Sequence, residues 1–492
     1  MAGLVKLNRT VLAALPGSVH SPRFDPVHLK PGIVHLGLGG FHRAHMARYT
    51  HDVMEHRPDG LRWGIIGASL IVPRMQECLA PQDNLYTLVE RSSAGETVTV
   101  IGSLASVMFA GNDSSMLLDE IARPNIRIVS LTVTESGYCL NSATKQLDPE
   151  HPLIRKDLAY PARPSSAIGI VVEGLRRRMI ADEAPFTALS CDNIQHNGEV
   201  LKQAVLALAR LRDQALADWI SARVGFPNTM VDRITPVTTE ADVAWLASHY
   251  GIADRCAVFC ETFRQWVIED RFGRGRPAWE EAGAQFVDDV GPHEFMKLRL
   301  LNASHLAVAG LGRLMGYITI DQAIADPLLT RYVRALMDRE TGPTLPHVPG
   351  IDLTAYKAQL IERFANTAIR DSVERVNTDA PLNVLVDPIR DRLRAGAPIS
   401  LLALGLAAWL RRVRGEDEQG KSINVRHPLA ELLRQKAIEG GDDPRPLLGI
   451  CELFGELGTD PRVVGPVGVW LGSLYRHGSC ATIADAARTF GL

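Results

Sequence analysis

The feature that most constrains the fold of this chain is an apolar run that leads directly into a glycine-rich turn. Residues 32–38 read GIVHLGL and residues 39–45 read GGFHRAH, where a helical pattern begins that continues to about residue 55. A strand, a glycine turn and a helix in this order can hold a pyrophosphate on backbone amides and at the helix N-terminus. The segment therefore predicts a dinucleotide-binding unit.

Individual residues of this turn have separate expected roles. Gly37 would allow the tight turn, and Gly39 would let a cofactor approach the backbone closely. The third glycine of the usual fingerprint is missing, because position 42 is a histidine. From this segment alone, a glycine turn without a ligand is the open alternative. The residues expected to bind the cofactor are Gly37, Gly39, Gly40, Phe41 and Arg43.

The second apolar run, residues 63–68, bears on the choice of cofactor. Dinucleotide-binding units usually place a carboxylate after their second strand, where it binds the adenosine ribose. Here the run is followed by Ser69-Leu70-Ile71-Val72-Pro73-Arg74, which contains no carboxylate. The arginine could face a 2′-phosphate or simply be solvated. From this segment the choice between NAD and NADP is therefore open.

The rest of the chain divides into an alternating half and a helical half. Three further apolar runs are typical of strands covered on both faces, and helical stretches lie between the runs. From about residue 292 one helical pattern follows another, separated by proline and glycine breaks, and no strand is evident. We therefore predict an α/β fold with a Rossmann-like N-terminal domain over 1–288, which has a parallel-rich sheet, and an all-helical C-terminal domain over 289–492. The runs are 126–134, 186–190 and 257–260; the helical stretches are 165–181, 199–224, 293–315, 327–339, 354–366, 399–414, 427–436 and 481–489.

Composition excludes several classes of function. The chain has 492 residues and a net charge of −3, so it has no bulk electrostatic reason to bind nucleic acid or a membrane surface. No apolar run reaches the roughly 18 residues that span a bilayer, and residues 1–31 contain no signal-peptide segment. The seven cysteines are scattered, which is typical of reduced thiols. We expect a cytoplasmic enzyme with no structural metal.

The sharpest chemical signal is the segment KLRLLNASH at residues 297–305. On an α-helix Asn302 would lie about 140° around the axis from Lys297, with His305 between them at about 80°. Burial lowers the pKa of a lysine, which can then accept a proton from an alcohol. The asparagine can donate to a developing alkoxide, and the histidine can orient a substrate. The alternative is an exposed Lys297 and Arg299 on a helix that links two domains.

Two further polar clusters follow predicted strands. Residues 190–198 read SCDNIQHNG, and Asn193 is placed to reach a ligand at the carboxyl end of a strand. An asparagine-rich turn is an equally good interpretation of this cluster. Residues 226–236 read FPNTMVDRITP, in which the neighbours Asp232 and Arg233 predict a local ion pair.

Taken together, these segments resemble the mannitol dehydrogenase family of long-chain, metal-independent polyol dehydrogenases. The resemblance runs from about residue 30 to the C-terminus. It is strongest to mannitol 2-dehydrogenases and then to fructuronate reductases; residues 349–366 and 374–377 favour the former. The motifs that carry it are GLGGFHRAH (37–45), LTVTESGY (131–138), SCDNIQHNG (190–198), FPNTMVDRITP (226–236), QWVIEDRF (265–272) and KLRLLNASH (297–305).

The resemblance implies an NAD-dependent oxidation of a secondary alcohol on a linear polyol, or the reverse ketose reduction, with D-mannitol and D-fructose as the expected pair. It implies an active site between the two domains, no catalytic zinc, and a monomer or weak oligomer. By resemblance, Lys297 is the catalytic base, Asn193 and Asn302 hold the substrate oxygen, and His305 hydrogen-bonds the reacting region. Substrate-binding positions are Asp232, Arg375 and Asn383, and Glu294 relays the proton of the lysine to solvent.

One departure from the family pattern bears on the substrate. Asn383 stands where relatives often carry a lysine that helps to hold the far end of the substrate. This departure leaves the substrate open between a neutral polyol and a uronate, whose carboxylate would need a cation. A fructuronate or tagaturonate reductase is the second hypothesis. A nucleotide-sensing protein that has lost the chemistry is the third, and the intact Lys297, Asn302, His305 and Asn193 argue against it.

Overall fold

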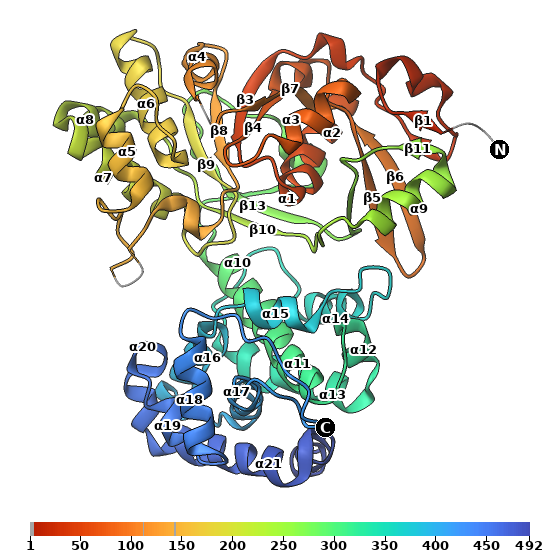
Figure 1. Cartoon of the computed structure of the whole chain (residues 1–492), viewed down its shortest axis with the longest axis vertical. Helices are drawn as coiled ribbons and strands as arrows, with labels where there is room; N and C mark the ends of the chain where they lie inside the picture. Colours follow the sequence, from red (N-terminus) through yellow and green to blue (C-terminus); the bar gives the residue numbers. More distant parts are fainter. Residues whose placement is uncertain (1–3, 112, 142–143) are drawn as a thin grey trace. The chain divides into compact units, whose positions relative to one another are not determined.

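The computed structural model describes residues 4–111, 113–141 and 144–492 (Figure 1). By their internal contacts these residues form two compact units, Met1–Val290 and Gly291–Leu492. The first unit is built on β-sheets with flanking helices, and the second is mostly helical. The predicted fold class, a Rossmann-like domain followed by a helical domain, is confirmed.

The first unit is organised around a five-stranded parallel sheet whose strand order is β7-β4-β3-β8-β9. The chain starts this sheet in the middle, at β3, builds outward in one direction and then returns to build in the other. This order places the carboxyl end of β3 at the point where ligands bind in open α/β sheets. The strands are β3 (Pro31–Leu36), β4 (Gly64–Ser69), β7 (Leu104–Phe109), β8 (Ile128–Leu131) and β9 (Thr187–Ser190).

Both faces of this sheet are buried, which explains the near-continuous apolar runs. Val34 belongs to one hydrophobic core, with the helices α6 (Ala167–Ile180) and α7 (Asn197–Arg212). Its neighbour Ile33 belongs to a second core, with the helix α2 (Met46–His56). Alternate side chains of one strand therefore pack on opposite layers of helices.

The prediction of a single sheet was wrong in one respect. Residues 257–260 do form a strand, β12 (Val258–Glu261), but it pairs with β5 (Tyr86–Ser92) in a separate four-stranded sheet. There β5 forms an antiparallel hairpin with β6 (Gly95–Ile101), which the sequence analysis missed. Another antiparallel pair, β10 (Thr229–Asp232) with β13 (Gln265–Glu269), was also missed.

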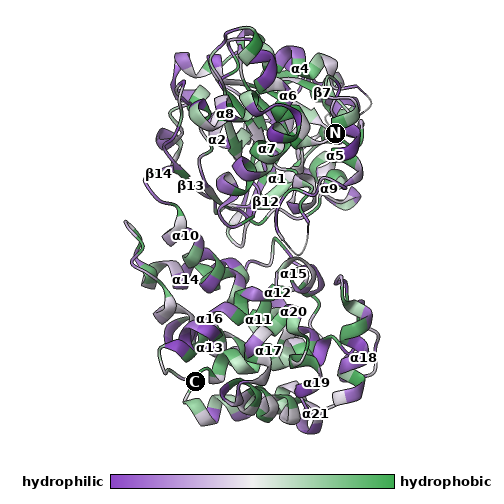
Figure 2. Cartoon of the chain, turned by 90° about the vertical axis from the view of Figure 1, so that its left-hand side faces the viewer, coloured by the Kyte–Doolittle hydropathy of each residue, from purple (hydrophilic) through white to green (hydrophobic). Residues whose placement is uncertain are grey.

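The helical unit is centred on two apolar helices, α11 (Ala303–Leu314) and α17 (Ser400–Arg412), which are drawn mostly green in Figure 2. They approach closely because small residues meet at the contact. A Cβ built on Gly405 would lie 3.2 Å from the Cβ of Ala307, and one on Gly310 would lie 3.5 Å from that of Ala408. The helical segment α21 (Pro461–Phe490) packs on α17 and is kinked at Gly478, which has a φ of +78°. The helix predicted over 481–489 lies after this kink.

One predicted helix differs in its extent from the structure. The stretch 199–224 is two helices, α7 and α8 (Gln214–Arg223), because Asp213 caps the second one with its side chain.

Across the described ranges, no helix has the length and apolar character that crossing a lipid bilayer requires.

Candidate active site

The glycine turn follows β3 directly and is shaped by a position that only glycine can occupy. Gly37 has a φ of +95°, and a Cβ there would lie 2.1 Å from the carbonyl oxygen of Thr132. At Gly39 the backbone is ordinary, and a Cβ would lie 3.9 Å from its nearest neighbour, the oxygen of Gly37. The turn is therefore tight on the protein side and open beside Gly39 and Gly40, as a backbone cradle for a pyrophosphate must be.

The histidine at the third fingerprint position packs against the strand. His42 lies in the short helix α1 (Gly40–Ala44), is fully buried, and stacks on His35 of β3 with ring centroids 3.4 Å apart. Burial holds the pKa of His42 well below its usual value and lowers the pKa of His35 to about 3, so both rings are neutral at pH 7. A neutral ring stack thus fixes the helix to the strand at the point where other fingerprints use a glycine.

The remaining turn residues support the backbone. Arg43 is buried; its Nε donates to the oxygen of Gly39 at 3.2 Å, and its guanidinium also binds the carbonyl of Cys256. The ring of Phe41 stacks on His45 at 4.9 Å. Arg43 therefore braces the turn from inside.

The carboxyl ends of β8 and β9 form the next part of the site. Thr134 has a φ of +62°, and its N–H donates to Asp192 Oδ1 at 2.7 Å. Tyr138 donates to the other oxygen of Asp192 at 2.9 Å, and burial raises the pKa of this carboxyl. Asn197 donates to the carbonyls of Asp192 and Thr229, both at 2.9 Å. These contacts fix the loop between β9 and α7.

Asn193 is an exposed residue of this braced loop, at the same edge of the sheet as the glycine turn. The sequence analysis missed Asp192 and Asn197, the two residues that hold the loop. The sequence feature that pointed to them is the polar run 190–198, which also suggested an ordinary turn. Asp232 is the buried last residue of β10, and its neighbour Arg233 forms an ion pair with Glu90.

Arg74, the residue that could face a 2′-phosphate, follows the second strand by five positions. Strand β4 ends at Ser69, and Arg74 is the exposed first residue of α3 (Arg74–Leu79).

The helix predicted over 293–315 contains a π-helical segment, so the expected α-helical geometry was wrong. The chain forms α10 (Gly291–Met296), the π-helix η7 (Lys297–Asn302) and then α11. The N–H of Ala303 donates to the carbonyl of Leu298, five residues earlier. Because a π-turn closes over five residues, Lys297 and Asn302 lie about one turn apart, not about 140° around the axis. The asparagine is thereby brought toward the side of the lysine.

The side chains of this segment are buried, which contradicts the alternative of an exposed linking helix. Lys297 is 7% exposed, Arg299 8% and His305 8%; Glu294, one turn before the lysine, is 5% exposed. Arg299 anchors the π-helix, because it donates to the carbonyl of Thr344 at 2.6 Å and also binds the carboxylate of an aspartate on α16 (Asn383–Arg394).

A carboxylate that the sequence analysis missed joins two of the predicted site residues. Arg375 lies on α15 (Val373–Asp379), and its Nε donates to Asp371 Oδ1 at 2.6 Å. His305 Nε2 lies 3.6 Å from Asp371 Oδ2, and the His305 ring stacks on Phe364 at 4.8 Å. Asn383 is the exposed first residue of α16.

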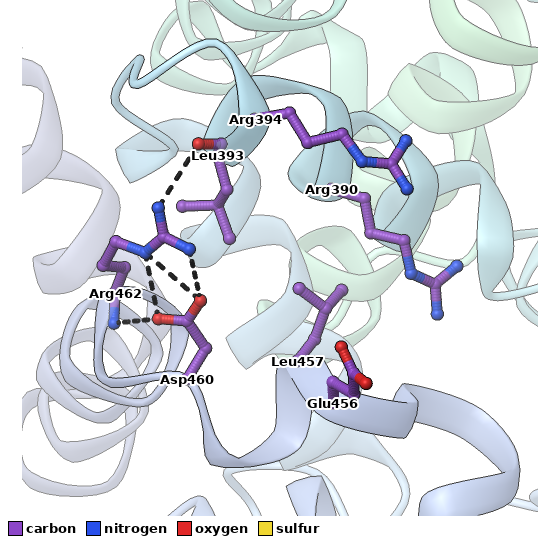
Figure 3. A pocket seen from close by; sticks show the side chains of 7 residues that line it. All are labelled: Arg390, Leu393, Arg394, Glu456, Leu457, Asp460 and Arg462. Atoms are coloured by element: carbon purple, nitrogen blue, oxygen red, sulfur yellow. Dashed lines mark hydrogen bonds and ion pairs between the residues drawn. The ribbon is translucent and has the colours of Figure 1, made fainter.

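A cavity of about 520 Å³ opens at the other end of α16 (Figure 3). Arg394, on its wall, is about 16 Å along the helix from Asn383, at 1.5 Å per residue. The arginines that line this cavity already face carboxylates. Arg462, for example, forms an ion pair with Asp460 at 2.7 Å. The lining contains no predicted site residue: it is Arg390, Leu393, Arg394, Glu456, Leu457, Asp460 and Arg462. In the portion of the chain that the structure describes, no group of three or more histidine, cysteine, aspartate or glutamate side chains could hold a metal ion.

Comparisons with known proteins cover almost the whole chain. The model of the mannitol dehydrogenase Rossmann domain matches residues 31–281, and that of the mannitol dehydrogenase C-terminal domain matches residues 289–474. Mannitol 2-dehydrogenase of Phaeosphaeria nodorum is 40% identical, over 98% of this chain and 86% of that protein. D-mannonate oxidoreductase of Escherichia coli is 43% identical, over 95% of this chain and 98% of that protein.

Among solved structures, the chain is similar to Pseudomonas fluorescens mannitol 2-dehydrogenase in its ternary complex with NAD and D-mannitol. The identity is 41% and the TM-score 0.89, and the match covers 98% of this chain and 100% of that one.

Proposed function

The chain belongs to the mannitol dehydrogenase family, and from this premise we propose that it catalyses the NAD-dependent oxidation of a secondary alcohol of a linear polyol to a ketose, and the reverse reaction. The observation that carries the proposal is the buried Lys297 at the start of a π-helical turn that ends at Asn302. A buried lysine beside an amide donor is suited to take a proton from a hydroxyl group and to stabilise the oxygen left behind.

The glycine turn fits the cofactor. Gly37, Gly39 and Gly40 would hold the pyrophosphate on their backbone, and Phe41 and Arg43 would keep the turn in place. A nicotinamide cofactor held there would supply the acceptor for the hydride that leaves the carbinol carbon. Arg74 is the residue that would meet a 2′-phosphate, so activity with NADP has to be measured beside activity with NAD.

We assign a separate role to each residue around the reacting oxygen. Lys297 Nζ takes the hydroxyl proton, and Glu294, one turn earlier on α10, passes a proton on to solvent. The side-chain amides of Asn193 and Asn302 donate to the oxygen as negative charge develops on it. His305 hydrogen-bonds the reacting region, and Asp232 binds a substrate hydroxyl.

We assign D-mannitol and D-fructose as the substrate pair. The supporting observation is that the guanidinium of Arg375 is already paired with the carboxylate of Asp371, while the second position, Asn383, is neutral. A substrate carboxylate would have to compete with Asp371 for this cation, whereas a neutral polyol needs only hydrogen bonds. The relatives that act on mannitol by name agree with this assignment.

The second candidate is a reductase that interconverts a hexuronate and an aldonate, such as fructuronate or tagaturonate reductase. It is favoured by the 43% identity with D-mannonate oxidoreductase of E. coli.

A substrate panel tests the assignment. Initial rates are measured with mannitol, sorbitol, arabinitol, mannonate and altronate, each with NAD and with NADP. We expect the highest kcat/KM for mannitol with NAD. A clear preference for an aldonate over every neutral polyol would overturn the first candidate in favour of the second. Binding of NADH without turnover of any of the five compounds would overturn both.

A further inference from the structure

Asp371 lies in a segment whose backbone is fixed without its side chain. Its carbonyl oxygen accepts from the N–H of Ile320 at 2.8 Å, and the next two residues hold the segment further. Ser372 caps α15 by accepting from the N–H of Glu374 at 3.2 Å, and Val373 donates to the carbonyl of Ile318 at 3.1 Å. These hydrogen bonds do not involve the carboxylate of Asp371.

That carboxylate instead contacts two residues of the proposed site. Its Oδ1 accepts from Arg375 Nε at 2.6 Å, and its Oδ2 binds the end of the same guanidinium. The Oδ2 atom also lies 3.6 Å from His305 Nε2, which is too long for a direct hydrogen bond but close enough for electrostatic attraction when the imidazole is protonated. The Asp371 side chain is 6% exposed, so water screens these interactions poorly.

The geometry has two consequences for a substrate. The two-point contact fixes the plane of the guanidinium, which sets the direction of its N–H groups. The negative charge of Asp371 also cancels most of the positive charge of Arg375, so the pair attracts an anion only weakly. The Arg375 side chain is 42% exposed, and its orientation is set by Asp371.

We propose that Asp371 is a positioning residue that orients Arg375 and His305 toward the substrate and, by neutralising the guanidinium, selects neutral polyols against carboxylate-bearing substrates. This inference rests on the proposed polyol dehydrogenase activity. It assigns to Asp371 a role in substrate choice that a residue important only for folding would not have.

The test is the nearly isosteric variant Asp371→Asn. We expect KM for the best polyol to rise about tenfold, the equivalent of about 1.4 kcal/mol, while kcat stays within about threefold. The ratio of kcat/KM for mannonate to that for mannitol should rise about tenfold, because the guanidinium is no longer neutralised. Binding of NADH, followed by fluorescence titration, should be unchanged.

The matched control is Asp387→Asn. Asp387 also pairs with an arginine on its own helix, Arg390, three residues away at 2.7 Å, but these side chains are 43% and 38% exposed and neither is a proposed site residue. The control should leave both KM values and the substrate ratio unchanged. Asp371→Glu keeps the charge but moves the carboxylate, so it should raise KM while leaving the substrate ratio near that of the wild type.

Three results would overturn the proposal: an unchanged KM in Asp371→Asn, an equal loss on every substrate, or an unchanged substrate ratio. If Asp371→Asn does not fold, as judged by its melting temperature, Asp371→Glu decides, and an unchanged KM in that variant overturns the proposal. The substrate panel on the wild-type enzyme tests the proposed function separately, because it does not depend on either variant.

Discussion

Lys297 and Asn302 are the first and last residues of one π-helical turn. In an α-helix, residues five apart point in clearly different directions, whereas the wider turn brings them close to one side of the axis. The two groups that we assign to proton transfer and to oxygen stabilisation are thus paired by an irregularity of the backbone. Such single π-turns inside helices are frequent at functional sites.

Removal of the lysine should abolish most of the activity. Lys297→Ala is expected to lower kcat by about 10³-fold or more, because it removes the amine that we assign as the proton acceptor. Affinity for NADH should be nearly unchanged in a fluorescence titration. Lys436→Ala is the control, since this lysine forms a surface pair with Glu439. Near wild-type turnover in Lys297→Ala would show that the assignment of the base is wrong.

The amide of Asn302 should matter for the rate more than for substrate binding. Asn302→Asp keeps the shape of the side chain but removes its N–H donors and adds a negative charge next to the developing oxyanion. We expect kcat to fall about 10²–10³-fold with a much smaller change in KM. Steady-state kinetics with mannitol measures both values. A fall in affinity alone, with kcat preserved, would contradict the role given to this amide.

The two glycines of the turn should respond differently to alanine. Gly37→Ala places a Cβ 2.1 Å from a backbone oxygen at a positive φ, so we expect a loss of about 2–4 kcal/mol of stability together with weaker NADH binding. The methyl group added by Gly39→Ala has no neighbour closer than 3.9 Å, so the melting temperature should stay at the wild-type value. It should still weaken NADH binding, because the methyl group occupies the side on which the pyrophosphate would approach. Equal effects of the two variants on stability would contradict this geometry.

The stacked histidines should make the protein less stable in acid. Burial depresses the pKa of His35 to about 3 and that of His42 well below 6.5, so the unfolded chain binds protons more readily than the native state. Stability is therefore highest above about pH 6.5 and falls as the pH drops from there toward 3, by up to about 1.4 kcal/mol per pH unit for each histidine.

The variant His42→Phe isolates this effect. It keeps an aromatic ring on His35 but removes one group that titrates, so its melting temperature should fall less than that of the wild type between pH 7 and pH 5. Both ring nitrogens of His42 lack a hydrogen-bond partner among the described residues, so the exchange breaks no hydrogen bond there. Parallel pH dependences of the two proteins would show that His42 does not titrate on unfolding.

Local patterns predicted the fold well where the signal lay within a few neighbouring residues. The run from β3 into the glycine turn and the apolar periodicity of α17 are both of this kind. The π-turn could not be predicted, because its amino acids also suit an α-helix and its anchor, Arg299, binds partners about 45 and 92 positions further along the chain. Asp371 could not be predicted for the same reason, because its contact with His305 joins residues that are 66 positions apart in the sequence.

The contact between α11 and α17 has a consequence for how this protein can change over evolutionary time. Gly405 lies against Ala307 on the helix that begins directly after Asn302 and carries His305. A larger residue at position 405 would push that helix away and move both side chains with it. Selection for activity and selection for a well-packed core therefore act on the same small residue, and neither property can drift at that position without the other.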